Sequence, residues 1–398
     1  MATEDRDLRS GQSVWKEPPL IGKPLTSDLQ VDVLVIGSGV TGVLLAERLS
    51  HHFSVAVVDE RGAARGSTPA STGLLLFEID TPLIELRKKI GRNDADRAWL
   101  RSNQTMRELL ERIEHLGIDC EMTRCDSIYL PGGTLDAEGL AEEAQARIEC
   151  GLPSRWIDGP ELRSRCPVEG EAAVISGNSA RVNPVRFALG FLQQAMSRNT
   201  RVFSKVDVTG IESGSGVVAL TKEGPTIAAK FAVFATGYEM PKYLSAPGKE
   251  IASTWVIATV AQPIDPSIHS ALVWEADDPY HYVRTTDAGR AIIGGEDEDF
   301  DDEDRRKALT PAKTKKLQEK LRNLFPQLDP SIEFAWSGAF GKSDTGLPSM
   351  GALPGKPNCY AALGFGGNGM TYAAIGARLI ERTLLGETDP DAGLFKFS

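Results

Sequence analysis

The stretch VDVLVIGSGVTGVLLAERLSHHFSVAVVD, residues 31–59, decides the fold of this chain. The apolar run 33–36 predicts a buried strand, which stops at the glycine-rich sequence GSGVTG of residues 37–42. Leucines then recur at helical spacing, and the β-branched run 55–58 predicts a second strand that ends in Asp59. Strand, glycine turn, helix, strand and acid in this order predict a dinucleotide-binding βαβ unit.

Each glycine of this turn meets a requirement of a bound pyrophosphate. Gly37 makes the tight turn, Gly39 lets the backbone approach the phosphates, and Gly42 lets the helix pack on the strand. The first N–H groups of the helix, at Val40 and Thr41, carry the positive end of its dipole toward the anion. The unit alone is compatible with NAD or FAD.

An acid follows the second strand, where the ribose of a dinucleotide lies. Asp59 is placed to accept hydrogen bonds from a ribose hydroxyl, but Glu60 is adjacent, and the sequence leaves the choice open with Asp59 preferred. The next loop is rich in small hydroxyl residues, which can donate to phosphate oxygens or a ribityl chain. The cofactor contacts expected from it are Arg61, Ser67, Thr68, Ser71 and Thr72.

Composition excludes several classes of protein. A chain of 398 residues suggests two domains, and its net charge of -11 argues against nucleic acid or an anionic membrane as partner. No apolar run approaches the ~20 residues needed to span a bilayer, and the acidic N-terminus does not resemble a signal peptide. Five cysteines without a CxxC pair predict reduced thiols, and five scattered histidines offer no metal site. We therefore expect a cytoplasmic, metal-free protein.

Two further segments accompany the predicted cofactor unit: the N-terminal segment that precedes it and a later apolar strand. Residues 1–30 are proline-containing and aperiodic, which predicts an extended arm over the surface. A fully apolar strand, 231–235, ends in Ala-Thr-Gly, which suits a buried parallel strand whose end approaches a cofactor. The cofactor contacts expected here are Val206, Ala235, Thr236 and Gly237.

The middle of the chain has a different pattern. Alternating runs at 257–261, 280–285 and 290–294, separated by long turns, predict an antiparallel sheet. The acidic run 296–304 (EDEDFDDED) predicts a solvated loop. Residues 310–325 predict an exposed basic helix with Pro311 in its first turn.

A second strand–glycine–helix junction lies near the C-terminus. The apolar strand 360–363 is followed by GFGGNGM and by a long alanine-rich helix, 371–385. Its N-terminus can stabilise negative charge on another part of a large cofactor, which a flavin needs and a nicotinamide does not. The two junctions together predict FAD. The contacts expected from the second one are Gly364, Gly366, Gly367, Asn368, Gly369 and Met370.

With these pieces in this order, the chain resembles the FAD-dependent amino acid oxidase family, which includes D-amino acid, glycine and sarcosine oxidases. The resemblance rests on GSGVTG, the loop VVDERG…RGSTPASTG, FAVFATG, YHYVRTTDAGRAIIGG, WSGAFGKSDTGLPSMG and GFGGNGMTYAAIGARLI. It implies an α/β fold: a Rossmann-type FAD-binding domain with a parallel sheet and a substrate domain with an antiparallel sheet. The expected boundaries are 31–80, 135–239 and 341–398 for the first, and 81–134 and 240–340 for the second. The implied reaction oxidises a C–N bond, with hydride passing to flavin N5 and the imine hydrolysing.

Two departures from the family concern the substrate. Phe340 stands where family members often carry a carboxylate-binding arginine, and Thr345 stands where an aspartate is usual. Arg284, on the same strand face as Tyr282, could replace that arginine because alternate strand residues share a face. Lys342 is a further candidate, for substrate charge or for polarising flavin or oxygen. The cysteine that carries the flavin in sarcosine oxidases has no counterpart in residues 341–349, so non-covalent FAD is expected.

Two other functions stay open on the sequence. The protein could be an FAD-dependent dehydrogenase or oxidase of a hydroxy acid or polyol, or a non-catalytic FAD-binding subunit of a larger dehydrogenase. The expected partners are a small-molecule amine, amino acid or hydroxy acid, and oxygen or another electron acceptor. Substrate identity, stereochemistry, the acceptor and the oligomeric state do not follow from the sequence.

Overall fold

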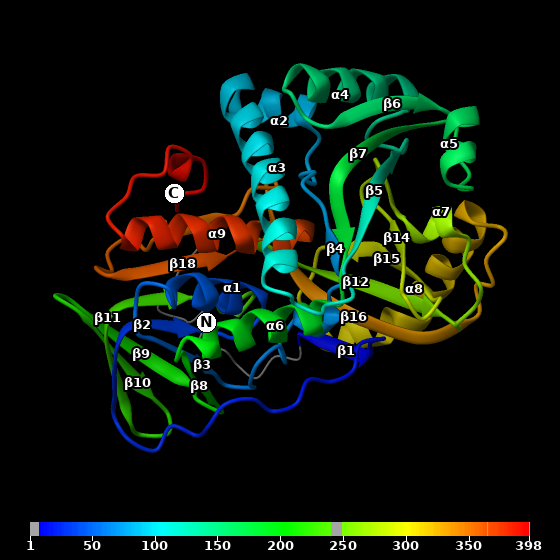
Figure 1. Cartoon of the computed structure of the whole chain (residues 1–398). Helices are drawn as coiled ribbons and strands as arrows, with labels where there is room; N and C mark the ends of the chain where they lie inside the picture. The colour runs from blue at the N-terminus through cyan, green and yellow to red at the C-terminus, as the bar shows by residue number, and fades with distance from the viewer. Residues whose placement is uncertain (1–7, 240–248, 364, 398) are drawn as a thin grey trace.

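The computed structural model describes residues 8–239, 249–363 and 365–397. Within these ranges the chain forms two β-sheets with helices packed on them; Figure 1 shows the smaller sheet at the lower left and the larger one at the right. The long helix α3 (Arg92–His115) contacts helix α9 (Gly369–Leu384) on one side and strand β7 (Ala172–Arg181) on the other. Parallel and antiparallel pairing both occur, so the predicted mixed α/β architecture is confirmed.

The smaller sheet is built around the strand that opens the dinucleotide unit. Its main strands, in spatial order, are β17 (Ser349–Ala352), β18 (Cys359–Leu363), β11 (Thr226–Phe234), β2 (Leu29–Ile36), β3 (Val55–Asp59) and β8 (Arg201–Ser204). All of these pair in parallel except β17 with β18. Val33 and Val35 of β2 join one buried cluster, and Leu34 and Ile36 join another, because alternate strand residues face opposite sides. The apolar run is therefore buried on both faces.

Different elements cover the two faces of this sheet. Helices α1 (Val40–Leu49), α6 (Pro184–Ser197) and α9 share the first cluster with Val33 and Val35. The hairpin of β9 (Val208–Ser213) and β10 (Val217–Thr221) extends the sheet from β11 and packs on the other side. Helix α1 contacts both α6 and α9, so the helix of the first glycine turn lies at the centre of the helical layer (Figure 1).

The larger sheet is mostly antiparallel. Its path is β1 (Arg9–Gln12), β16 (Ile332–Ser343), β12 (Lys249–Thr259), β15 (Ala291–Glu298), β14 (Tyr282–Thr285), β13 (Ala271–Glu275), β5 (Thr123–Leu130), β7 and β4 (Leu74–Leu75), with β6 (Ser154–Asp158) beside β7. Helix α8 (Glu303–Leu324) packs against β12, β15 and β16. Its Leu317 and Leu321 enter the core beside Trp255 and Ile293.

Shorter elements connect these layers. The remaining helices are α2 (Leu83–Ile90), α4 (Ala137–Glu149), α5 (Gly159–Arg165), α7 (Pro266–His269) and the 3₁₀ turns η1 (Thr68–Ala70), η2 (Gly366–Asn368) and η3 (Ala392–Leu394). Strands β6 and β7 lie in the larger sheet, although the sequence placed residues 135–239 with the cofactor unit. That boundary therefore does not follow the division between the sheets.

The N-terminal segment differs from the expected surface arm. Residues 9–12 form β1 and pair with β16, which places them at the edge of the larger sheet. Trp15 is buried, and its indole Nε1 donates to the carbonyl of Ser71 at 2.8 Å. The described part of the arm is thus built into the molecule beside the predicted cofactor loop.

The prediction of a solvated loop over residues 296–304 is wrong for its first part. Glu296 and Glu298 continue β15, and Lys313 of α8 lies between them, with Nζ 3.2 and 2.8 Å from their carboxylates. Helix α8 also begins at Glu303, earlier than predicted, because the Asp302 side chain accepts from the N–H of Arg305 and caps it. Pro311 consequently lies inside the helix and not in its first turn.

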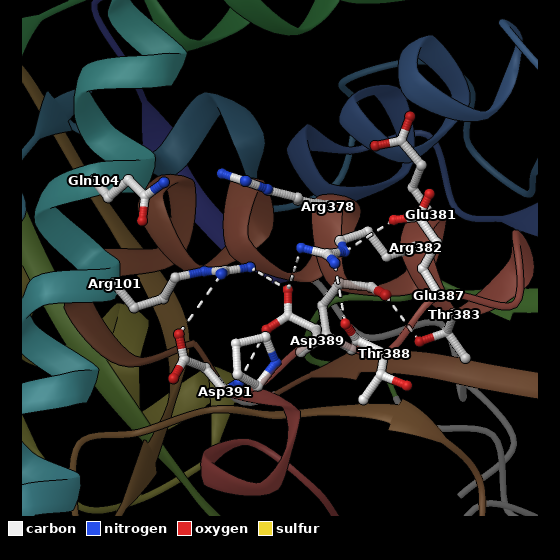
Figure 2. Close-up of polar contacts among 12 residues, drawn as sticks. Arg101, Gln104, Arg378, Glu381, Arg382, Thr383, Glu387, Thr388, Asp389 and Asp391 are labelled. Carbon is white, nitrogen blue, oxygen red and sulfur yellow. Dashed lines mark hydrogen bonds and ion pairs between the residues drawn. The ribbon is translucent and has the colours of Figure 1, made fainter.

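A buried ion pair fixes the segment after α9. Figure 2 shows Arg101 of α3 reaching Asp389 and Asp391, while Arg382 of α9 reaches Asp389 and the carbonyl of Thr388. The Arg101 Nη2–Asp389 Oδ2 distance is 2.8 Å, and both side chains are buried. This contact ties the C-terminal segment to the helical layer over the smaller sheet.

Candidate active site

A cavity runs from the carboxyl ends of β2, β3 and β11 to residues of β14, β15 and β16. It therefore joins the two sheets. The sequence-predicted residues that line it are Gly37, Gly39, Val40, Thr41, Asp59, Glu60, Arg61, Ser67, Thr68, Ser71, Thr72, Val206, Ala235, Thr236, Gly237, Tyr282, Gly366, Gly367, Asn368, Gly369 and Met370. Of the other cofactor candidates, Gly42 lies behind the first turn, and Gly364 lies outside the described residues.

The first glycine turn leaves room for a close approach at one position only. Gly37 has a φ of +104°, and a Cβ there would lie 2.3 Å from the carbonyl oxygen of Ala235. A Cβ on Gly42 would lie 1.8 Å from the carbonyl oxygen of Gly37, so this glycine is required by packing. A Cβ on Gly39 would meet only Thr68 Oγ1, at 3.4 Å. The space beside Gly39 therefore belongs to the cavity and not to the protein core.

Some polar groups around this turn have no hydrogen-bond partner among the residues that the structure describes. Helix α1 has no side-chain cap, so its first N–H groups face the cavity mouth without a side-chain acceptor. The hydroxyls of Ser67 and Thr236 are buried and have no hydrogen-bond partner in the described structure. Buried donors without partners are rare in folded proteins, and their number here indicates a polar ligand.

Asp59 is engaged by the turn itself. Its Oδ2 accepts from the N–H and the hydroxyl of Ser38, at 2.7 and 2.8 Å. Its Oδ1 accepts from the N–H groups of Arg61 and Gly62, at 2.8 and 2.7 Å. An ionised carboxylate has about four acceptor positions, so these four bonds use them all. Asp59 therefore ties the end of β3 to the glycine turn.

Glu60 has a different environment in the cavity wall. Arg61 pairs with both Glu60 and Glu239, which links the ends of β3 and β11. Burial raises the pKa of Glu60 to about 7; Arg61 acts in the opposite direction, and Glu239 adds to the rise. Glu60 thus offers a carboxyl group whose second oxygen is not used by the backbone of the turn.

The second glycine turn closes the cavity at the start of α9. Helix α9 also lacks a side-chain cap, and Asp80 accepts there from the N–H of Gly367 at 2.9 Å and from Asn368 Nδ2 at 3.1 Å. A Cβ on Gly367 would lie 2.2 Å from the hydroxyl of Tyr280. The glycine therefore allows the tyrosine and Asp80 to reach the helix end.

The far end of the cavity is aromatic. The rings of Trp274 and Tyr280 lie 6.3 Å apart, and those of Tyr280 and Tyr282 lie 5.8 Å apart. Tyr282 packs across Gly294, where a Cβ would lie 2.3 Å from the tyrosine hydroxyl. Phe340 of β16 completes this wall. Large flat rings beside a polar, glycine-lined end suit a site that holds an extended cofactor and an organic substrate.

Comparison with known proteins agrees with this geometry. The family model described as DAO, FAD dependent oxidoreductase, matches residues 32–383. The chain belongs to this family. It is 24% identical over 387 residues to gamma-glutamylputrescine oxidoreductase of Escherichia coli, covering 92% of this chain and 86% of that protein.

Solved structures show the same fold. The crystal structure of glycine oxidase from Geobacillus kaustophilus superposes with a TM-score of 0.77 at 21% identity, covering 93% of this chain and 99% of that one. L-alpha-glycerophosphate oxidase from Mycoplasma pneumoniae, solved with FAD bound, superposes with a TM-score of 0.73 at 15% identity over 91% of this chain and 97% of that one. FAD is the cofactor of this oxidoreductase, and the open space at Gly39 and the unpartnered hydroxyls of Ser67 and Thr236 fit such a group.

Of the three residues predicted to contact substrate or oxygen, one lines the cavity and the other two do not. Tyr282 lines the cavity. Arg284 does not: its Nη1 donates to the carbonyls of Thr72, Gly73 and Val182, at 2.7 to 3.1 Å. Lys342 is half-buried, and its Nζ lies 2.7 Å from Asp299, which is exposed. Neither cation is among the described residues that line the cavity.

Sequence reasoning missed the carboxylates of the substrate end. Glu78, Asp80 and Asp297 line the cavity together with Leu74 and Leu76. Residues 74, 76, 78 and 80 alternate along an extended segment, and this period of two was the signal that could have found them. Asp297 belongs to the acidic run 296–304, for which the sequence predicts a solvated loop, so it is not expected to line a cavity.

Other features of the described chain bear on the cofactor and on location. The five cysteines carry free thiols, and none is among the described lining residues. Among the residues that the structure covers, no group of histidine, cysteine or acidic side chains could hold a metal ion. No helix within the described ranges has the length and apolar character to cross a membrane.

Proposed function

We propose that this FAD-dependent oxidoreductase oxidises the C–N bond of an amine or amino acid. The observation that carries the proposal is the cavity itself, which connects two uncapped helix ends and then continues to the aromatic wall of Trp274, Tyr280 and Tyr282. The glycine turns 37–42 and 366–369 would hold FAD, whose flavin would supply the acceptor for a hydride from the carbon beside the substrate nitrogen, giving an imine that water would hydrolyse. An aromatic chamber next to the second helix end is where such a substrate would lie.

In this proposal the two helix ends divide the cofactor between them. The first turn, with Gly39 at its closest point, holds the pyrophosphate, and the turn 366–369 holds the flavin end. We propose Glu60 as the ribose acid in place of the preferred Asp59, because the four acceptor positions of Asp59 are taken by the turn. FAD is held non-covalently in this proposal, since no described cavity residue is a cysteine.

The chain's own residues supply orientation and exclusion of water. Tyr280 and Tyr282 present adjacent rings, and Trp274 is buried behind Tyr280. Burial raises the pKa of the Tyr282 phenol above its ordinary value, so this hydroxyl stays protonated at neutral pH and can donate a hydrogen bond. Holding the substrate in one orientation lowers the activation free energy of the reaction substantially.

An anaerobic substrate panel tests the proposal. The purified FAD-loaded protein is mixed, in separate samples, with amines, D- and L-amino acids, hydroxy acids and polyols. The absorbance of the oxidised flavin, at about 450 nm, is then followed. We expect bleaching by an amine or amino acid, with chemical reduction by dithionite as the positive control. Bleaching by hydroxy acids alone would support the hydroxy acid dehydrogenase, and a flavin that no compound reduces would support the non-catalytic subunit.

A further inference from the structure

We propose that the substrate end of the cavity is built for an organic cation, an amine that carries no carboxylate beside its reacting nitrogen. This inference rests on the proposed function, because it assigns the class of its substrate.

Three carboxyl groups enter the chamber from two directions. Glu78 and Asp80 lie two residues apart on the extended segment after β4, and both line the cavity. Asp297 lines it from β15, in the other half of the larger sheet. A Cβ on Gly367 would lie 2.2 Å from the hydroxyl of Tyr280 and 3.0 Å from Oδ1 of Asp80, so Asp80 lies beside the aromatic wall. The acidic character is therefore a property of the chamber and not of one loop.

Some of these carboxylate oxygens have no hydrogen-bond donor. Oδ1 of Asp297 is buried and unpartnered, although Asp297 belongs to a strand. Glu78 is 1% exposed and forms an ion pair with Arg147, whose Nη1 lies 3.8 Å from Oε1, but neither of its oxygens accepts a hydrogen bond from the described residues, and burial raises its pKa. A buried polar oxygen that accepts no hydrogen bond is costly. A ligand that donates hydrogen bonds or carries positive charge would remove that cost.

The titration of these groups agrees with this reasoning. Burial raises the pKa of Asp80 to about 6, against the opposing N–H of Gly367 and hydroxyl of Tyr280. Burial also raises the pKa of Asp297 to about 6, against the hydroxyl of Thr254 and the positive charge of Lys342, and the charge of Asp80 adds to the rise. Both carboxyl groups are therefore ionised at neutral pH, although burial disfavours their charged form. A bound cation would stabilise that form.

Aromatic rings complete a cation-binding chamber. Trp274, Tyr280 and Tyr282 follow one another at centroid distances of 6.3 and 5.8 Å. One face of Trp274 is stacked on Tyr129 at a centroid distance of 3.8 Å, so a ligand has Tyr280, Tyr282 and the other side of Trp274 available. A cation over the face of a Trp or Tyr ring is attracted by the negative charge of the ring quadrupole. Carboxylates and aromatic rings thus favour the same kind of ligand.

Four described cations that could concern the chamber are held by other groups. Arg147 is not among the lining residues, and it pairs with Glu143 at 2.7 Å and with Glu78 at 3.8 Å. Arg61 lines the cavity at its other end, where it pairs with Glu60 and Glu239. Arg284 is turned to backbone carbonyls, and Lys342 to Asp299. Phe340 occupies the chamber wall. A carboxylate ligand would therefore meet carboxyl groups and rings among the described residues, and like charges at short range repel.

Binding of a cation that cannot react tests this inference in the FAD-loaded protein. Benzyltrimethylammonium has no nitrogen lone pair for oxidation, and benzoate is an aromatic anion of similar size. Isothermal titration calorimetry and the shift of the flavin spectrum report binding of either probe without turnover. We expect the cation to bind at least about tenfold more tightly than benzoate.

Variants identify the groups responsible. Asp297→Asn should weaken the cation by about tenfold or more, while Asp126→Asn, which changes an exposed acid of β5, should leave its affinity unchanged. Phe340→Arg should reverse the preference toward benzoate. Tighter binding of benzoate by the unmodified protein, or an Asp297→Asn variant that binds the cation as before, would overturn the inference.

These outcomes are separable from those of the substrate panel. If amino acids reduce the flavin but the quaternary cation does not bind, the cation inference fails and the proposed function stands. If the cation binds and no amine reduces the flavin, the proposed function fails although the chamber has the predicted charge preference. Reduction of the flavin by amines that lack a carboxylate, together with tight binding of the cation, supports both.

Discussion

A methyl group added at Gly39 should separate cofactor binding from folding. Gly39 has a φ of -73° and a ψ of -172°, which alanine adopts without strain, and its added Cβ would meet only Thr68 Oγ1, at 3.4 Å. Alanine is a poorer helix N-cap than glycine, but it also restricts the unfolded chain, and these effects of about 1 kcal/mol or less oppose each other. We therefore expect Gly39→Ala to leave the free energy of unfolding of the FAD-free protein almost unchanged.

The same methyl group would occupy the space in which, under the proposed function, the pyrophosphate of FAD approaches the backbone. Overpacking of a close contact costs about 1–3 kcal/mol, which corresponds to a rise in the FAD dissociation constant of roughly 5- to 150-fold. Gly42→Ala is the matched control, because its Cβ would lie 1.8 Å from the Gly37 carbonyl oxygen and must disturb the turn itself. It should lower the free energy of unfolding of the FAD-free chain.

Two measurements on each variant decide the question. Urea unfolding of the FAD-stripped chain gives stability, and quenching of flavin fluorescence on reconstitution gives the dissociation constant. The reasoning is refuted if Gly39→Ala binds FAD as tightly as the unmodified protein. It is also refuted if Gly39→Ala destabilises the FAD-free chain as much as Gly42→Ala does.

Four further outcomes are expected. Glu60→Gln should weaken FAD by about tenfold through loss of a charged hydrogen bond, whereas Asp59→Asn should mainly lower the urea midpoint of the FAD-free chain. Asp389→Asn should lower the free energy of unfolding in urea at neutral pH, by less than the about 3–5 kcal/mol of a fully uncompensated buried charge, because buried Arg101 keeps only its longer contact to Asp391, 3.6 Å away. Burial raises the pKa of Asp389, but the Asp391 N–H and Arg101 outweigh it and lower the pKa, so the effect should fade as the pH drops through the lowered value. Lys342→Met should leave the rate of flavin reoxidation by oxygen, measured by stopped flow, unchanged, because the Lys342 ammonium pairs with Asp299. A slower rate would indicate that Lys342 assists the reaction with oxygen. Below a pH of about 6, protonation of Asp297 and Asp80 should raise the calorimetric dissociation constant of the quaternary cation, and a flat profile from pH 5 to 8 would contradict this.

Local sequence pattern predicted the cofactor half of the cavity because that half is made of local signals. Two glycine turns, each between an apolar strand and a helix, impose their geometry within a few residues. The alternation of Val33 and Val35 with Leu34 and Ile36 likewise places each side chain without knowledge of the partner strands. Such features need no tertiary information.

The substrate half depended on contacts between distant segments. Asp297 was predicted to be solvated because its neighbours are acidic, but pairing of β15 with β12 continues the strand, and Lys313 of α8 neutralises Glu296 and Glu298. Alternation correctly put Arg284 on the face of Tyr282, yet the segment 72–73 covers it there and takes its donors. No local pattern could show either neighbour.

The charges that line the cavity can disfavour a substrate that carries a carboxylate, such as an amino acid, without a residue that blocks the carboxylate sterically. Loss of an arginine removes an attraction, and because specificity is a difference of affinities, an added repulsion increases it further. Asp80 supplies such a repulsion, since it accepts from the N–H of Gly367 and the side-chain amide of Asn368 and so puts negative charge beside the turn that precedes α9. Asp297 faces the same chamber with an unpartnered oxygen. A substrate carboxylate would have to displace or neutralise these groups, whereas an ammonium group would find its counter-charge already in place.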